Sequence, residues 1–355
     1  MRRLFEPCIT LYDNGEVDNN MEKSGLGQPM ISNSDSKKQQ LTGILIVLFA
    51  SALFSSLGTL TNIAYEAGVS PIAFGAWREI FGAITMCVLL IFGVGRQRNQ
   101  KKVLSNIPLW QWRNLSIAAL AFMSYSLAIF YAFVHLTVAL AFLLFYIYPA
   151  IVTLISAVTG REMLNKQKII ALLLALGGSS LAVVGQMFGE EMRFDWLGIG
   201  LALFAAIGMS VYFLVGRKGY PSVPASYATT IFLIAAGTVF ATMGFIFGEK
   251  EAILQPFHDA SLWPILIFAG VVAAALPTML LLTGIRMIGA SKASILAIFE
   301  PVMGAILAAI VLGQNLYFIQ IVGGILILSA AFLLQRNSDS QDIESTVSPQ
   351  VIKTS

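Results

Sequence analysis

The stretch AFLLFYIYPAIVTLISAVTGREML at residues 141–164 decides the fold, because it has a counterpart at residues 293–316, ASILAIFEPVMGAILAAIVLGQNL. When the two stretches are superposed, Pro149 falls on Pro301, and a short polar turn follows each apolar run. Such self-similarity indicates an internal repeat. The number of helices that separates the two stretches determines how the two copies are oriented.

The composition is that of a membrane protein. Of the 355 residues, 57% are hydrophobic and 12% are charged, whereas roughly a quarter of an ordinary soluble domain is charged. A membrane core about 30 Å thick needs roughly 20 apolar residues per helix. Ten segments meet this requirement: 41–64, 71–95, 113–134, 137–158, 167–187, 196–216, 226–248, 262–285, 290–312 and 318–335. We therefore predict an all-α integral membrane protein of the plasma membrane with ten transmembrane helices.

The lysines and arginines are concentrated in alternate connections, which predicts orientation because cytoplasmic connections carry the positive charge. The positive side of the membrane holds Lys37, Lys38, Arg96, Arg98, Lys101, Lys102, Arg113, Arg161, Lys166, Lys168, Arg217, Lys218, Arg286 and Arg336. The intervening connections are poor in positive charge, and 66–70 and 134–137 contain none. Both termini are therefore predicted to be cytoplasmic. The polar tails 1–40 and 337–355 lack apolar periodicity and are predicted to be disordered.

The repeat unit is five helices, because the fourth predicted span pairs with the ninth. Five is an odd number, so the second copy enters the membrane from the opposite side. We predict two inverted five-helix repeats, at 41–187 and 196–335. Inverted repeats around a site near the middle of the membrane are typical of secondary transporters.

These features resemble the drug/metabolite transporter superfamily and, within it, the EamA-type permeases. The resemblance rests on ten predicted spans in two halves, the prolines in spans four and nine, "FEP" at 299–301, and the polar turn after each of those spans. It covers roughly residues 41–335. Members typically carry a Gly-Glu pair after span nine, where this chain has Gly313 and Gln314. The resemblance implies transport of a small solute by alternating access, with substrates that range from amino acids to metabolites and drugs.

Two adjacent charges lie inside the second predicted span, in "AWREIFGAITM" at 76–86. A charge at the centre of a membrane helix costs about 2.5–3.5 kcal/mol and usually faces a cavity or a partner. Arg78 and Glu79 point about 100° apart, so we expect each to contact another helix or a central cavity. Gly75 and Gly82 let neighbouring helices approach and turn this face inward. Arg78 is a candidate for binding an anionic substrate group, with Glu79 pairing with it or taking up protons; the alternative is a network that holds the helix in place.

The ninth predicted span carries Lys292 and Glu300. Pro301, next to Glu300, removes one helical hydrogen bond, and such interruptions often line a transporter cavity. Glu300 is thus a candidate for substrate contact and for proton uptake during transport; the alternative is a neutral glutamate that joins two helices. Lys292 lies near the cytoplasmic end, where it either faces substrate or snorkels to the headgroups.

Aromatic residues complete the candidate site. Tyr146 and Tyr148 stand beside Pro149 in "FLLFYIYP" and predict an aromatic wall, which binds apolar or cationic solutes. Trp77, next to Arg78, is a candidate for the same reason. For all three residues the alternative is ordinary packing in the core.

We predict a secondary active transporter that moves a small metabolite, such as an amino acid or a related solute. The chain has no nucleotide-binding motif, no cofactor motif and no catalytic signature such as H-E-x-x-H or G-x-S-x-G, so we do not expect an enzyme. A membrane channel or sensor is the alternative. The net charge of +3 forms no basic patch, which argues against nucleic acid. The expected partners are a small-molecule substrate and the lipid bilayer, and a homodimer is left open.

Overall fold

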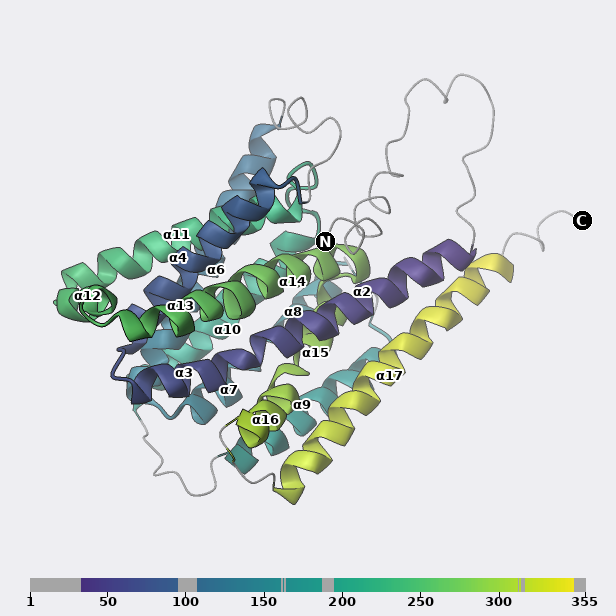
Figure 1. Cartoon of the computed structure of the whole chain (residues 1–355). Coiled ribbons are helices and arrows are strands. Elements are labelled where there is room, and N and C mark those ends of the chain that lie inside the picture. The colour runs from purple at the N-terminus through teal and green to yellow at the C-terminus, as the bar shows by residue number, and fades with distance from the viewer. Residues whose placement is uncertain are drawn as a thin grey trace, which may run out of the picture.

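The computed structural model describes residues 33–94, 107–160, 162, 164–186, 195–311, 313 and 317–347. Every helix or strand assigned within those ranges is a helix (Figure 1). In chain order the helices are α2 (Asn33–Phe54), α3 (Ser56–Glu66), α4 (Pro71–Ile91), α6 (Leu109–His135), α7 (Val138–Phe145), α8 (Tyr148–Val158), α9 (Lys166–Gln186), α10 (Trp196–Lys218), α11 (Ala225–Ile246), α12 (Lys250–His258), the 3-10 turn η2 (Ala260–Leu262), α13 (Trp263–Gly270), the π-helix η3 (Val271–Ala275), α14 (Leu276–Ile288), α15 (Ala290–Ala297), α16 (Glu300–Val311) and α17 (Phe318–Val347).

Length and apolar composition make nine of the described helical segments long enough to cross a membrane. These are Lys38–Glu66, Pro71–Ile91, Leu109–His135, Val138–Val158, Lys166–Val184, Trp196–Lys218, Ala225–Ile246, Ala260–Ile288 and Ala290–Val311. A shorter apolar helix covers Phe318–Leu334, at the position of the tenth span predicted from the sequence. The part of the chain that the structure describes is therefore all-helical, and its apolar segments are those of a multi-pass membrane protein.

Two helices extend into the segments that the sequence assigns to the polar tails. Helix α2 begins at Asn33, before its apolar segment, and α17 continues to Val347 beyond its own. Nucleation is the costly step of helix formation, whereas each added residue gains one hydrogen bond. Polar residues such as Lys38 and Gln40 therefore continue a helix that the apolar segment has already nucleated.

Several earlier predictions concern residues outside the described ranges. These include the tail segments 1–32 and 348–355, the charged residues Arg96, Arg98, Lys101, Lys102 and Arg161 used for orientation, and Gln314.

Helices that are distant in sequence pack side by side. The most extensive contacts join α17 to α9, α10 to α6, α11 to α4, and α14 to α2; Figure 1 shows α17 running beside α9. Small residues allow the closest of these approaches. A Cβ atom added at Gly178 of α9 would lie 2.6 Å from the carbonyl oxygen of Gly323 on α17, which is too close for any side chain.

Proline residues interrupt three of the long segments. Helix α7 ends at Phe145 and α8 begins at Tyr148, so that Pro149 lies in the first turn of α8. In the same way, α15 ends at Ala297 and α16 begins at Glu300, immediately before Pro301. In the segment Ala260–Ile288, the π-helix η3 precedes the proline of α14. A proline has no N–H, so each interruption leaves a backbone carbonyl without its helical donor.

Candidate functional site

Helix α4 places its charged face against two other segments. A Cβ atom at Gly75 would lie 2.6 Å from the ring of Phe240 on α11, and one at Gly82 would lie 3.0 Å from Ala274 of η3. Both glycines therefore permit close helix packing, as the sequence predicted. The consequence is that the face of α4 that carries Arg78 and Glu79 is turned into the protein.

Arg78 and Glu79 form an ion pair within α4. Arg78 is 5% exposed and Glu79 is 0% exposed, and Arg78 Nη1 donates to Glu79 Oε1. Ser126 of α6 donates from its Oγ to the same carboxylate oxygen over 3.1 Å. The pairing of Glu79 with Arg78, one of the two roles considered for Glu79, is present because the long arginine side chain bends back to its neighbour. The expectation that each would also contact another helix was right.

The other end of the Arg78 side chain is bound by a backbone carbonyl. Nε donates over 3.1 Å to the carbonyl oxygen of Ala273 in η3, and Nη2 donates to the same oxygen. In a regular α-helix this carbonyl would accept from residue 277, which is Pro277 and has no N–H. The proline therefore leaves the Ala273 oxygen free for the guanidinium, while the ring of Phe130 lies 5.9 Å from its Cζ.

Glu300 lies where the two broken helices meet. Its carboxylate is hydrogen-bonded to the hydroxyl of Tyr146, in the break between α7 and α8. Tyr148, at the start of α8, is also close enough to interact with it electrostatically. Tyr146 and Tyr148 are buried, whereas Glu300 keeps part of its accessible surface. The prolines that follow Glu300 and Tyr148 thus bring together one carboxylate and two phenols.

Tyr125 of α6 lies between this carboxylate and the ion pair. Its phenol interacts electrostatically with Glu79, Arg78 and Glu300, and its ring stacks on Phe145 at 6.2 Å between centroids. The structure therefore joins the two groups of charges, which come from opposite halves of the sequence. Tyr125 and Ser126 were not singled out from the sequence, since hydroxyl-bearing residues are common in membrane helices.

Two of the sequence-predicted residues lie away from Glu300. The indole Nε1 of Trp77 donates over 2.9 Å to the carbonyl oxygen of Ile253 on α12, and the ring packs in an aromatic cluster with Phe81, Phe257 and Trp263. Lys292 lies in α15, eight residues before Glu300, which is about 12 Å of helix. Lys292 is 9% exposed; that it faces substrate or snorkels to the headgroups stays a prediction.

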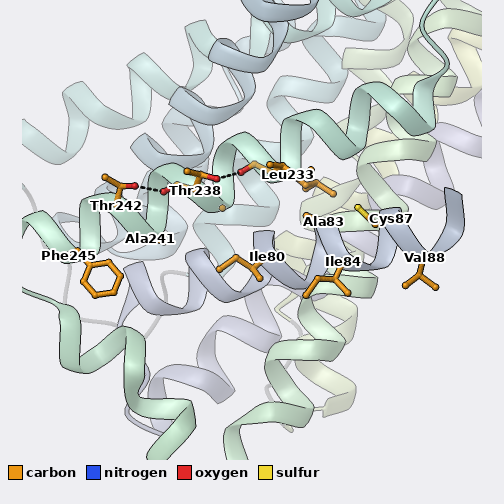
Figure 2. Close-up of a pocket in the computed structure, with 12 residues that line it drawn as sticks. Ile80, Ala83, Ile84, Cys87, Val88, Leu233, Thr238, Ala241, Thr242 and Phe245 are labelled. Atoms are coloured by element: carbon orange, nitrogen blue, oxygen red, sulfur yellow. Dashed lines mark hydrogen bonds between the residues drawn. The ribbon is translucent and has the colours of Figure 1, made fainter. Parts of the chain in front are cut away.

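A groove of about 650 Å³ lies between α4 and α11, and Figure 2 shows its aliphatic lining. Its two threonine hydroxyls, at Thr238 and Thr242, donate to carbonyls of their own helix. The remaining lining residues are Ile80, Ala83, Ile84, Cys87, Val88, Leu233, Ile234, Gly237, Ala241 and Phe245. This surface lacks charge and suits the acyl chains of lipids, so we do not assign it to a polar solute.

A cluster of charges around the Glu162 carboxylate joins several connections at the end of the bundle that the sequence assigns to the cytoplasm. The carboxylate of Glu162 accepts from Lys168 Nζ over 3.1 Å and from Arg217 Nη1 over 2.7 Å. The backbone N–H of Ser291 donates to the same carboxylate over 3.4 Å. Gly289, with φ of +92°, permits this approach, because a Cβ there would lie 2.8 Å from the Glu162 oxygen. The cluster connects both halves of the chain.

The connection between α10 and α11 is fixed at the same end of the bundle. Gln111 donates from Nε2 to the Ser222 hydroxyl and accepts from the Ser222 N–H, each over 3.0 Å. Arg286 donates over 2.7 Å to the carbonyl of Val223 and lies 4.9 Å above the ring of Tyr220. Burial raises the pKa of Tyr220 to about 12, although the nearby guanidinium opposes this shift. The phenol therefore stays neutral at physiological pH.

Comparisons with known proteins agree with this architecture. The chain is 23% identical over 291 residues to the uncharacterized transporter YcbK of Bacillus subtilis, covering 81% of this chain and 90% of that protein. It is 19% identical over 342 residues to the WAT1-related protein At4g01430 of Arabidopsis thaliana, covering 88% and 92% of the two chains. A protein of known crystal structure shares the fold with a TM-score of 0.67 at 19% identity, covering 87% of this chain and 99% of its own.

The model of the EamA-like transporter family matches the chain twice, at residues 41–184 and 196–336. The two matches together include most of the residues between the tails. The chain therefore belongs to the EamA-like transporter family and is a membrane transporter.

Proposed function

We propose that this protein is a secondary active transporter that moves a small metabolite, such as an amino acid or a related solute, by alternating access. The observation that carries the proposal is the meeting of two broken helices at the contact between Tyr146 and Glu300. Interrupted helices that meet within a bundle are where transporters of this kind bind their solutes. A partly exposed carboxylate at that point is suited to contact with a solute.

The helix packing supports two inverted five-helix repeats, with boundaries near 41–187 and 196–335. A two-fold operation that exchanges the repeats maps the third span (α6) onto the eighth (which contains α14). It maps the sixth span (α10) onto the first (which contains α2). It therefore turns the packing of α6 on α10 into the packing of α14 on α2, and both pairs are among the most extensive. The double match of the family model supports the same division. We also propose ten spans, both termini in the cytoplasm, and location in the plasma membrane.

The contacts at the proposed cytoplasmic end support alternating access. The Glu162 cluster and the Arg286 contacts join connections from both halves of the chain. A solute that leaves the site in this direction requires these contacts to separate. They are therefore the contacts that we expect to break when the transporter opens to the cytoplasm.

Within the site we assign substrate contact to Glu300, Tyr146 and Tyr148. We assign the ion pair of Arg78 and Glu79 to holding α4, α6 and η3 together, because the two side chains bond to each other and to groups of α6 and η3. Trp77 and Lys292 are not included in the proposed contact set.

Reconstitution of the full chain in liposomes tests the proposal. Vesicles loaded with one unlabelled solute from a panel of amino acids, amines and carboxylates receive the labelled solute outside. A carrier gives saturable uptake that is accelerated by the solute inside, whereas a channel gives linear flux with no acceleration. Vesicles without protein are the control. Linear flux for every transported solute would reject the carrier in favour of the channel.

A further inference from the structure

The charges around the site do not cancel. Arg78 and Glu79 are joined as an ion pair, and the Arg78 guanidinium also acts electrostatically on Glu300. One guanidinium cannot balance two carboxylates, so the group keeps one negative charge in excess. Among the residues that the structure describes, no lysine or arginine is within ion-pair distance of Glu300. Its hydrogen bond comes from a neutral phenol, that of Tyr146. Glu300 also begins α16, and the N-terminal end of a helix stabilises a negative charge.

Two tyrosine rings, those of Tyr146 and Tyr148, lie next to this carboxylate, and each packs on a phenylalanine ring. The ring of Tyr146 stacks on Phe142 at 5.7 Å between centroids, and the ring of Tyr148 lies 5.2 Å from Phe145. The face of an aromatic ring attracts a cation by about 0.5–2 kcal/mol, and more when water is excluded. A carboxylate flanked by aromatic rings is therefore complementary to an organic cation.

The site is poorly suited to a carboxylate group. Glu300 repels a second negative charge, and the guanidinium of Arg78 is already engaged by Glu79 and by the carbonyl of Ala273. Lys292 lies about 12 Å away along the helix, and the residues between Lys292 and the break are buried.

We propose that this site recognises organic ammonium cations in preference to zwitterionic amino acids and to carboxylates. The proposal rests on the transport function proposed above and names its substrate class. The aromatic rings favour a solute that carries an aromatic or apolar group beside the ammonium. An amine thus fits both features of the site, whereas the corresponding amino acid adds a carboxylate for which the site has no free cationic partner.

Three solutes with the same phenyl group test this order: phenethylamine is a cation at neutral pH, phenylalanine is a zwitterion and phenylacetate is an anion. Each is added to the purified full chain in detergent, and the rise of the unfolding temperature gives an apparent affinity. We expect phenethylamine to bind at least about tenfold more tightly than either of the others, which corresponds to 1.4 kcal/mol or more. Equal or tighter binding of phenylalanine or phenylacetate, or no binding of phenethylamine, would overturn the proposal.

Variants identify the residue responsible. Glu300→Gln should lower phenethylamine affinity at least about tenfold, whereas Glu66→Gln, the same change at an exposed residue that ends α3, should leave it unchanged. If Glu300→Gln does not fold, Tyr146→Phe is the second variant, and we expect it to lower phenethylamine affinity about threefold to tenfold. Unchanged affinity in whichever of these two variants folds contradicts the proposal.

Counterflow separates this inference from the transport proposal. Amine binding without counterflow of any solute supports the cation site and rejects the carrier. Saturable counterflow of phenylacetate with no response to phenethylamine supports the carrier and rejects the cation site.

Discussion

The protein holds two groups of charges in the middle of its helices, and they differ in what surrounds them. Arg78 and Glu79 are almost fully buried, and their partners come from α6 and η3. Glu300 is partly exposed and is bonded to one phenol. Glu79 Oε2 has no hydrogen-bond partner among the described residues, but its other oxygen is bonded twice. We therefore expect the buried pair to hold helices together, and the partly exposed carboxylate to contact a solute. The position of a charge in a membrane helix therefore does not by itself identify a binding residue.

Removal of Arg78 should have the largest effect on stability. Arg78→Gln leaves the buried carboxylate of Glu79 without its counter-ion, and breaking a buried pair in this way costs about 3–5 kcal/mol. Denaturant titration of the purified protein in detergent measures the change in the free energy of unfolding.

The matched control is the double variant Arg78→Gln/Glu79→Gln. It contains no unpaired charge, so most of the lost stability should return. A single Arg78→Gln variant that is as stable as wild type, but no longer transports carboxylates, would contradict the bracing role and restore the earlier hypothesis that Arg78 binds an anionic group.

Ser126→Ala should have an intermediate effect. The variant removes the 3.1 Å hydrogen bond to the buried Glu79 carboxylate, and a hydrogen bond to a charged group contributes about 1.5–3 kcal/mol. The same denaturant titration measures it. Ser124→Ala is the control, because the Ser124 hydroxyl donates to a carbonyl of its own helix. If the two variants lose equal stability, the Ser126 hydroxyl is not a specific support of the ion pair.

Tyr146→Phe should change stability less. It removes the phenol oxygen next to Glu300 but keeps the ring, and a hydrogen bond of this kind contributes about 0.5–1.5 kcal/mol. Because the carboxylate is partly exposed, water can replace the lost donor. A loss of stability as large as that of Arg78→Gln would show that Glu300 is enclosed by the protein in the same way as Glu79.

The sequence predicts the features that depend on local chemistry. The apolar segments are helical, and two of the three helix interruptions described above occur at prolines identified in advance, Pro149 and Pro301. The glycines at 75 and 82 do pack closely against other helices. Glu300 was selected because it stands beside a proline, and this signal is local too.

The partners of Arg78 depend on distant parts of the chain and were not predicted. The carbonyl that binds Arg78 belongs to Ala273, 195 residues later, and it is available because Pro277 lacks an N–H. Pro277 is visible in the sequence, but its relation to Arg78 follows from the packing of η3 on α4. The partner of Trp77 is distant in the sequence too, since the helix directs this side chain to α12 and away from its neighbour's partners.

The smallest effect is expected for an exposed pair of side chains at the end of the helices, His135 and Asp195. This pair is the exposed counterpart of the buried pair Arg78 and Glu79. Asp195 accepts a hydrogen bond from the N–H of Leu197 and pairs with His135 Nδ1 at 2.6 Å, and the two side chains are 42% and 29% exposed. The Leu197 amide first, and then His135, hold the pKa of Asp195 below its ordinary value of 3.8. A lowered pKa in the folded state stabilises the protein above the ordinary pKa, and this stability is lost as the pH falls through the folded pKa.

Asp195→Asn keeps an oxygen for the helix cap but removes the titrating charge. Between about pH 5 and pH 3, wild type should therefore lose slightly more stability than the variant, as measured by the unfolding temperature in detergent. Asp259→Asn is the control. Asp259 also has a lowered pKa, but its hydrogen bonds come from the Ser261 hydroxyl and amide, whereas Asp195 is paired with a histidine. Exposure makes such pairs weak. A pH-dependent difference between wild type and Asp195→Asn as large as the effect of Arg78→Gln would mean that burial is not what separates the bracing charges from the accessible ones.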